Sequence, residues 1–364
     1  MTVRARLLLP VFALGLHLLA VTHPEVVETY YSRALYPRLA ASLAFVSGRL
    51  PFTLAEPLLA GALVTLALLG FRRLRLLRGR SWTAAMAESA ARVLSLAGAL
   101  YLLFLGVWGF NYQRLTLAGT MSLAVRPTNR LELTEVGAAL ATRADTLRVG
   151  LPEDRHGVLR LAMGSRDALG RTQSGFVEAR SRFPVILVPA ARPKPAFFSP
   201  VLSRLAISGI YAPLTAEPLV NAEVPDPDLP FCAAHEMAHA AGFAREDEAN
   251  YLASVACRLH VDADFRYSGT LAASLYVVSA LGAVDRDAAR RLHDGRSAAV
   301  KRDIEALDAW AARHEGPVAE ASRRVNHAYL RSQGTPDGVA SYGRFVDLLL
   351  AEHRAEGEMP GSRP

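Results

Sequence analysis

The stretch Pro230–Asn250, PFCAAHEMAHAAGFAREDEAN, gathers two histidines, four carboxylates and an amide into an otherwise apolar, alanine-rich neighbourhood. His235 and His239 are four residues apart, so on a helix they project from one face and can bind one metal ion together. Glu236 follows the first histidine, where a carboxylate can reach a metal-bound water without itself binding the metal. The pattern is HExxH, here HEMAH, and the alternative interpretation is the polar face of an ordinary helix.

A third ligand is available in the segment that follows. Gly242 stands three residues after His239 and can end the first helix, so that a second helix returns a ligand to the ion. In the sequence EDEAN, Glu246 and Asn250 are again four residues apart and share a face. We expect Glu246 as the third ligand in preference to Glu248, and Asn250 as a hydrogen-bond partner of a ligand histidine or of a neighbouring carbonyl. Two histidines and a glutamate suit one Zn²⁺ ion, although similar sites accept other divalent metals.

Composition places part of the chain in a membrane. Of its 364 residues 51% are hydrophobic, and the mean hydropathy of +0.18 is high for a soluble protein. The net charge is +7, but residues 1–92 carry 11 Arg and 4 acidic residues, whereas the rest has 30 basic and 30 acidic residues. The excess charge therefore indicates membrane topology signals, and no nucleic-acid partner is expected. Cys232 and Cys257 either form a disulfide in an oxidising compartment or are two buried thiols.

Three apolar segments are candidate membrane spans, at residues 7–21, 53–71 and 93–110. The first is short and contains Pro10 and His17, so a cleaved signal peptide and a buried core helix are alternatives for it. After residue 110 we expect no further apolar run long enough to cross. The lipid bilayer is thus an expected partner of residues 1–110.

The loop between the second and third segments, residues 72–92, sets the orientation. Its first part, RRLRLLRGR, has five arginines directly beside a membrane end, as the positive-inside rule expects of a cytoplasmic loop. Residues 22–52 and the whole of residues 111–364 then lie outside the cytoplasm, even if the first segment is a cleaved signal. We therefore expect a multi-pass protein with an extracytoplasmic C-terminal domain.

The domain at residues 111–364 is expected to be mainly α with a small β component. Leu131–Val149 has the apolar spacing of a helix, and Phe183–Pro189, FPVILVP, is predicted to be a short strand. Leu205–Val224 is predicted to form paired strands with proline-containing turns. Helices dominate from Phe231 to the end.

The metal-site residues resemble the gluzincin metallopeptidases. HEMAH followed by EDEAN is similar to the membrane-attached members of that group, whose second helix reads Glu-x-x-Ala-Asp. The resemblance implies that His235, His239 and Glu246 hold one zinc ion. Asn250 stands where those proteins have Asp and would support a ligand through a hydrogen bond.

A second resemblance covers nearly the whole chain. The three N-terminal apolar segments and several motifs are similar to an uncharacterised bacterial family, domain of unknown function 3810. The motifs are WGFNYQR (residues 108–114), SGIYAPLTAEPLVN (208–221), HEMAHAAGFAREDEAN (235–250), DFRYSG (264–269) and GVASYGRFVDLLLA (338–351). This resemblance implies a protein of the bacterial cytoplasmic (inner) membrane and little about its substrate.

The gluzincin resemblance also implies a zincin-like α+β domain, in which Ile207–Leu214 is an edge strand above the HExxH helix. A substrate peptide would add to that edge as another strand. A plain structural hairpin is the alternative. The residues expected to contact substrate are Ile207, Ser208, Gly209, Ile210 and Tyr211.

Hydrolysis by such a site needs a base and a group that stabilises the oxyanion. Glu236 would take a proton from the water and pass it to the leaving amine, while zinc polarises the scissile carbonyl. Tyr342 is our first candidate for the oxyanion stabiliser. Tyr211, His260 and His327 are further candidates.

We therefore expect a membrane-anchored zinc metallopeptidase that cuts a peptide or protein outside the cytoplasmic membrane. One alternative is a sensor whose zinc domain detects an extracytoplasmic ligand. Another is a structural membrane protein in which zinc only joins two helices. Glu236 discriminates, because a purely structural zinc site has no use for an unliganded carboxylate at the water position.

Overall fold

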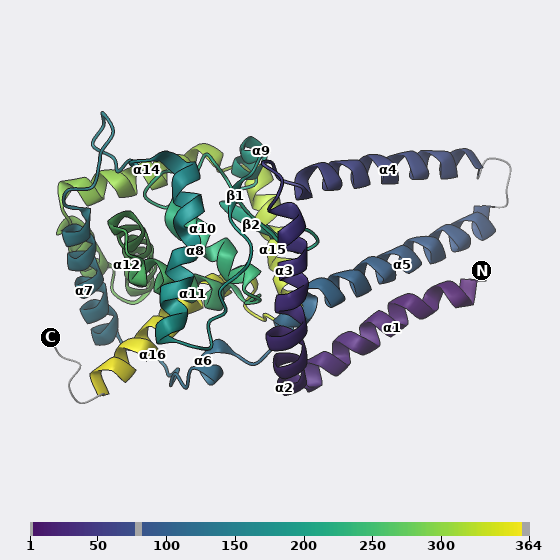
Figure 1. Cartoon of the computed structure of the whole chain (residues 1–364), viewed down its shortest axis with the longest axis horizontal. Coiled ribbons are helices and arrows are strands. Elements are labelled where there is room, and N and C mark those ends of the chain that lie inside the picture. The colour runs from purple at the N-terminus through teal and green to yellow at the C-terminus, as the bar shows by residue number, and fades with distance from the viewer. Residues whose placement is uncertain (1–2, 77–81, 359–364) are drawn as a thin grey trace.

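The computed structural model describes residues 3–76 and 82–358, and it is mainly helical with one small sheet (Figure 1). Three long helices extend from the same side of a rounded helical body, with the N-terminus at their far end. They are α1 (Val3–Thr22), α4 (Ala55–Leu76) and α5 (Trp82–Val107). The described chain thus consists of three projecting helices and a helical body.

The projecting helices have the length and composition of membrane spans. The windows Ala55–Arg72 and Glu88–Val107 each qualify on their own, and α1 qualifies together with the helical segment after it, across a 93° bend. Their apolar side chains are largely exposed, and a helix that is apolar all round without protein around it is typical of a membrane span. The predicted segment at 7–21 lies in α1, and the segment at 53–71 lies in α4 apart from its first two residues. The third helix ends earlier than predicted, at Val107.

The predicted basic loop, residues 72–92, is helical at both of its ends. Helix α4 continues to Leu76 and α5 begins at Trp82, because arginine and alanine are good helix formers and extend both helices past their apolar parts. Arg78 and Arg80 of that loop lie outside the described residues.

The expectation that no apolar run follows residue 110 was wrong. Helix α12 (Ala263–Val284) also has the length and composition of a span, but 56% of its window is buried inside the body. It packs against α7 (Arg130–Arg148), α10 (Leu229–Ala240) and α11 (Glu246–Leu259). A helix surrounded by other helices needs apolar residues on every face, so composition alone cannot separate a central core helix from a span.

The segment after α1 turns back onto the body. It comprises α2 (Pro24–Val26), a π-helical turn η1 (Val27–Leu35) and α3 (Tyr36–Ser47), and α3 stands against the body where the long helices reach it (Figure 1). Tyr31 and Tyr36 are buried in one apolar cluster with Trp108 and Tyr112. Residues 24–47 are therefore part of the folded body.

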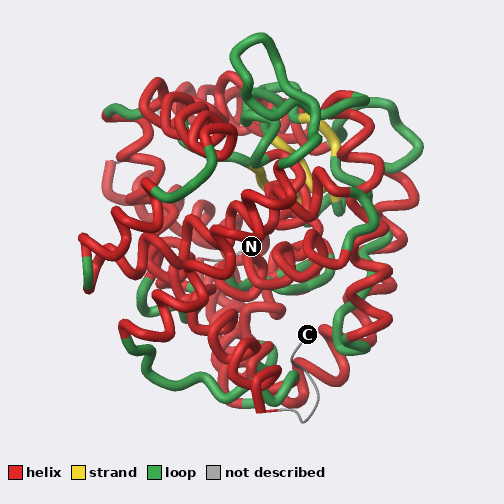
Figure 2. Tube along the Cα trace, turned by 90° about the vertical axis from the view of Figure 1, so that its left-hand side faces the viewer, coloured by secondary structure: helices red, strands yellow, loops and turns green. Residues whose placement is uncertain are grey.

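The sheet has three short strands in the order β1–β3–β2, gathered at one side of the helices in Figure 2. Strand β1 (Lys194–Pro195) pairs parallel to β3 (Glu217–Val220), and β2 (Gly209–Ala212) pairs antiparallel to β3, with Gly209 opposite Val220. The pairing predicted within Leu205–Val224 is confirmed. Among the described residues, β2 pairs with a strand on one side only and is therefore an edge strand.

The strand predicted at Phe183–Pro189 is wrong, because this segment forms a turn and an irregular loop after α8 (Gly164–Arg182). Pro184 and Pro189 lack the backbone N–H that a sheet ladder requires. The apolar side chains of this loop pack against the main core without forming a strand, and Ile186 is fully buried there.

The predicted helix at Leu131–Val149 is α7, which begins with a capping box between Asn129 and Glu132. Helices also dominate after residue 231, as predicted. The remaining elements are a 3-10 turn η2 (Gly109–Gln113), α6 (Leu117–Thr120), α9 (Ser199–Arg204), α13 (Arg286–Asp294), α14 (Ala298–His314), α15 (Pro317–Ser332), a 3-10 segment η3 (Gly338–Arg344) and α16 (Phe345–Glu358).

Candidate metal centre

A tight turn between α10 and α11 brings the two halves of the motif together. Gly242 ends α10 with a φ of +89°, a left-handed conformation that glycine adopts without strain. Its N–H donates to the His239 carbonyl at 2.8 Å, and the Phe243 N–H donates to the Ala238 carbonyl at 3.2 Å. This pair of bonds is the Schellman ending of a helix. Helix α11 then starts at Glu246, beside the last turn of α10.

Three ligand atoms converge at this junction. His235 Nε2 lies 3.0 Å from His239 Nε2, and Glu246 Oε2 lies 3.2 Å and 3.4 Å from those two nitrogens. A tetrahedral zinc ion about 2.0–2.1 Å from each ligand separates its ligand atoms by about 3.3 Å. Among residues 3–76 and 82–358, these three form the one group of His, Cys, Asp and Glu with metal-ligand spacing. The spacing therefore fits a small divalent cation.

The tautomers of both histidines also fit a metal. The Nδ1 of His235 donates to Asn250 Oδ1 and the Nδ1 of His239 donates to the Phe243 carbonyl, each at 2.8 Å. In a neutral ring the lone pair is then on Nε2, so two nitrogens and the Glu246 oxygen point acceptor atoms at one place. Glu246 Oε2 is buried and accepts no hydrogen bond from the described residues. Three converging acceptors without a donor are stable only when a cation or protons lie between them.

The electrostatics of the cluster favour positive charge. Burial on its own disfavours the charged ring, but the Glu246 carboxylate beside it raises the pKa of His239 to about 9 in the metal-free protein. Burial likewise opposes ionisation of Glu246, yet the two imidazoles hold its pKa below the ordinary value. A metal ion would displace the proton that this arrangement attracts.

Glu248, the alternative third ligand, points elsewhere. Its Oε1 accepts from the Leu117 N–H at 2.7 Å and from Arg245 Nη1 at 2.9 Å, and the residue is buried. Glu248 therefore holds the chain after η2 against α11. The structure brings Glu246 to the histidines, in agreement with the preference for it.

Glu236 lies beside the cluster without belonging to it. The side chain is 4% exposed, and its Oε2 has no hydrogen-bond partner among the described residues. Burial raises the pKa of this carboxyl, and the charges of His235 and His239 oppose that rise. On its other side it abuts Gly209 of β2, where an added Cβ would lie 2.6 Å from Glu236 Oε1. A buried carboxylate oxygen without a hydrogen-bond partner destabilises the fold, and a catalytic role is one reason for a protein to keep such a group.

A cavity of about 1500 Å³ opens beside these residues. The three ligand residues and Glu236 form part of its wall, so an ion bound there would be reachable from the cavity. Strand β2 and the residues before it form another part. All five residues predicted to contact substrate line it, namely Ile207, Ser208, Gly209, Ile210 and Tyr211.

Tyr342 lies on η3 and also lines the cavity. Its ring is nearly parallel to that of His235, with 6.4 Å between centroids and 12° between planes. Burial and the nearby Glu246 charge raise the pKa of Tyr342, which keeps its hydroxyl protonated and able to donate. Of the further candidates for the oxyanion stabiliser, Tyr211 lines the cavity and the two histidines do not. His260 stacks on Phe265, and His327 Nδ1 accepts from the Val339 N–H at 3.4 Å.

Sequence reasoning missed three residues that hold the end of α10. Trp108 Nε1 donates to the His239 carbonyl at 3.4 Å, Tyr36 donates to the Ala240 carbonyl at 3.1 Å, and Arg114 Nη1 donates to the Gly242 carbonyl at 3.0 Å. The last carbonyls of a helix lack the donor four residues on that interior carbonyls have, so these side chains add to the backbone turn that ends α10. Trp108 and Arg114 belong to the WGFNYQR motif, which was noticed in the sequence without a role.

Arg114 is itself fixed by a buried ion pair. Its Nε and Nη2 donate to Glu28 Oε2 and Oε1, both at 2.8 Å, and both side chains are at least 95% buried. The guanidinium also lies 4.1 Å above the Phe243 ring. Glu28 on η1 is therefore linked through Arg114 to the turn at Gly242. The next residue in that turn, Phe243, has the carbonyl that orients the His239 ring.

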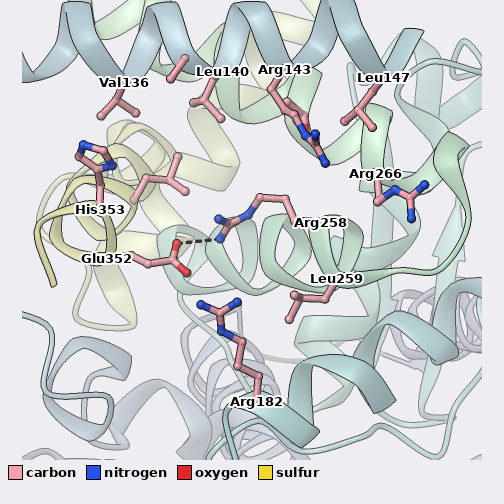
Figure 3. Close-up of a pocket in the computed structure, with 13 residues that line it drawn as sticks. Val136, Leu140, Arg143, Leu147, Arg182, Arg258, Leu259, Arg266, Glu352 and His353 are labelled. Atoms are coloured by element: carbon pink, nitrogen blue, oxygen red, sulfur yellow. Dashed lines mark hydrogen bonds and ion pairs between the residues drawn. The ribbon is translucent and has the colours of Figure 1, made fainter. Parts of the chain in front are cut away.

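Two further features lie apart from this centre. Cys232 and Cys257 are buried free thiols and form no disulfide. A smaller cavity of about 380 Å³ lies between α7, α11 and α16, where Arg258 forms an ion pair with Glu352 at 2.7 Å (Figure 3). None of the predicted site residues lines it.

The fold and site describe a helical protein with candidate membrane spans and a His-His-Glu cluster. The chain belongs to the family described as "Protein of unknown function (DUF3810)", whose model matches residues 31–350. The match runs from η1 to α16 and includes both α4 and α5, whereas α1 lies before it. No curated protein and no solved structure matches the chain.

Proposed function

We propose that this protein is a zinc-dependent metallopeptidase anchored in the bacterial cytoplasmic membrane, with its zincin-like catalytic domain outside the cytoplasm. The observation that carries the proposal is the unpartnered, buried Glu236 beside three converging acceptor atoms on the wall of a large cavity. Chemistry of this kind needs a metal site that remains open and a base that is not a ligand. His235, Glu236 and His239 on α10 together with Glu246 on α11 support both requirements.

Each residue has a distinct task in this proposal. A zinc ion held by His235, His239 and Glu246 would polarise the scissile carbonyl and make a water more acidic. Glu236, whose pKa is raised by burial, would accept the proton of that water and donate it to the leaving amine. The hydroxyl of Tyr342 would donate to the oxygen on which negative charge develops.

The supporting contacts fit this division of tasks. Asn250 and the Phe243 carbonyl hold the two histidine rings in the tautomer and orientation for metal binding. The open edge of β2 would pair with the substrate backbone and place the scissile bond next to Glu236, which Gly209 allows to approach the strand closely.

The orientation is proposed from the arginines beside the ends of α4 and α5. A reporter that is active only outside the cytoplasm, fused after Pro364, should be active. A fusion that works only in the cytoplasm would overturn the orientation.

The two alternatives predict different behaviour of Glu236. A helix-joining zinc site has no need of an unpartnered carboxylate or of a cavity beside the ligands, since structural zinc sites are closed. A sensor could use the cavity to bind its ligand, but it has no need of a base beside the metal. The peptidase proposal uses both features, and we therefore favour it.

The test uses the full chain in phospholipid vesicles, loaded with zinc and supplied with a mixture of quenched fluorogenic peptides. Glu236→Gln should bind zinc as the wild type does and cleave more slowly by a factor on the order of 10²–10⁴, the contribution of a general base. Glu305→Gln, an exposed position on α14, is the matched control and should be unaffected. Equal rates for Glu236→Gln and wild type would refute the catalytic role.

A further inference from the structure

The cavity beside the metal centre continues along the end of a candidate membrane span. Leu100, Leu103, Phe104 and Val107 of α5 form part of its wall. These residues lie in the window Glu88–Val107 that qualifies as a span. Leu100 is seven residues before Val107, which at 1.5 Å per residue is about 10 Å along the helix axis. The cavity therefore extends to the level of the last two turns of this candidate span.

The metal centre lies close to the same level. Trp108 follows the last residue of α5, and its ring centroid is 6.0 Å from that of His239. Its Nε1 donates to the His239 carbonyl. Trp108 therefore connects the end of the candidate span directly to the metal centre, through the contact of its ring with His239.

Helix α15 also contributes exposed apolar side chains to the cavity wall. Helix α15 lies where α5 meets the body (Figure 1), and Tyr329 contacts Phe104 and Tyr112 with ring centroids 6.5 Å and 6.0 Å apart. Val318 and Val325 line the cavity and are 56% and 70% exposed. Exposed apolar side chains grouped beside candidate spans are typical of a surface that contacts membrane-embedded groups.

Charged groups are few along this part of the cavity. Apart from the metal centre and its base, the lining contains Asp228 and Arg323 as charged residue types. Burial raises the pKa of Asp228, which favours its neutral form. A strongly charged segment would lose its hydration here without gaining partners. The chemistry of the wall therefore matches an apolar chain.

We infer that the substrate is a polypeptide anchored in the same membrane, and that its apolar segment next to the bilayer enters the cavity between α5 and α15. The inference rests on the proposed peptidase function and names its substrate class. The segment extends along β2 toward Glu236, and its apolar side chains contact Leu103 and Val325. Cleavage then occurs close to the membrane surface.

The test is photo-crosslinking in the full chain carrying Glu236→Gln, which we expect to bind the peptide and to cleave it too slowly to deplete it during crosslinking. A photoreactive phenylalanine replaces Val325 in the cavity or, as control, Leu66 on α4, an exposed position outside the cavity. The vesicles contain a peptide with a transmembrane anchor followed by a randomised apolar segment. Two comparison peptides are the same segment without the anchor and an anchored segment of charged residues.

At position 325 we expect the anchored apolar peptide to crosslink at least about tenfold more than the unanchored one, because anchoring raises its effective concentration at the cavity. It should also exceed the anchored charged peptide, whereas position 66 should not distinguish the two anchored peptides. Equal crosslinking of all three peptides at position 325 would overturn the inference. Adducts with phospholipid alone would overturn it too and identify the cavity as a lipid site.

Hydrolysis by the zinc-loaded wild type separates this inference from the proposed function. Cleavage of the unanchored peptide as fast as the anchored one contradicts the inference and leaves the peptidase function standing. Crosslinking at position 325 without cleavage of any peptide contradicts the peptidase function, and the substrate assignment fails with it. Faster cleavage of the anchored apolar peptide supports both.

Discussion

Replacing Gly209 with alanine is expected to slow catalysis without removing the metal. In the structure, a Cβ at this position would lie 2.6 Å from Glu236 Oε1, 2.7 Å from its Cγ and 2.8 Å from its Cδ. Non-bonded carbon atoms normally approach to about 3.5–4.0 Å. The carboxylate must therefore move by about 1 Å, away from β2.

A displacement of about 1 Å at a catalytic group costs on the order of 10²-fold in rate. That factor corresponds to about 2.7 kcal/mol in the activation free energy. The free energy of unfolding should change by less than about 1 kcal/mol, because the clash is with the end of a flexible side chain and the strand backbone accepts alanine. The zinc ligands lie elsewhere, so the zinc content should be unchanged.

The assay compares kcat for cleavage of the quenched peptides, normalised to bound zinc, in vesicles. Gly170→Ala is the control, since a Cβ at that helical position meets no atom within 4 Å. If Gly209→Ala retains full activity and full zinc, Glu236 does not act from the position in which the structure holds it.

Three further predictions concern a contact that orients a histidine of the cluster, a buried ion pair, and an ion pair between α7 and α16. Asn250→Leu removes the acceptor that orients the first histidine ring, and should weaken zinc binding by about 10–100-fold in competition with a chelator. Glu28→Gln leaves the buried charge of Arg114 without its partner, and should lower the free energy of unfolding by about 3–5 kcal/mol in denaturant titrations. The Arg354 guanidinium lowers the pKa of Glu132 from 4.5 to about 2, so this carboxylate stabilises the fold above pH 5 and loses that contribution as the pH falls toward 2. The denaturation midpoint of Glu132→Gln should therefore differ most from the wild type at neutral pH, and a constant difference down to pH 2 would contradict the assignment.

The cluster of His235, His239 and Glu246 could be predicted from sequence because its pattern is local. Both histidines, the turn at Gly242, and Glu246 with Asn250 fall within 16 consecutive residues, and helical periodicity fixes which of them share a face. The hairpin of β2 and β3 was found for the same reason. Short segments with a regular period need no knowledge of the rest of the fold.

Contacts between distant parts of the chain were not predictable. Tyr36 reaches the Ala240 carbonyl across 204 positions, and Glu28 reaches Arg114 across 86. Nothing in the sequence of residues 24–47 indicated that they pack against the end of α10. The false strand at Phe183–Pro189 shows the opposite failure, since a short apolar run does not reveal whether its side chains enter the core from a strand or from a loop.

The most direct test of the central claim is the zinc content of the purified full chain, measured by elemental analysis for wild type, Glu246→Gln and Glu248→Gln. The two variants make the same isosteric change two residues apart on α11, but only Glu246 faces the histidines. We expect about one zinc per chain in the wild type and in folded Glu248→Gln, and a loss of zinc in Glu246→Gln. A folded wild-type protein without zinc, or equal zinc in all three, would contradict the assignment of His235, His239 and Glu246 as the metal centre.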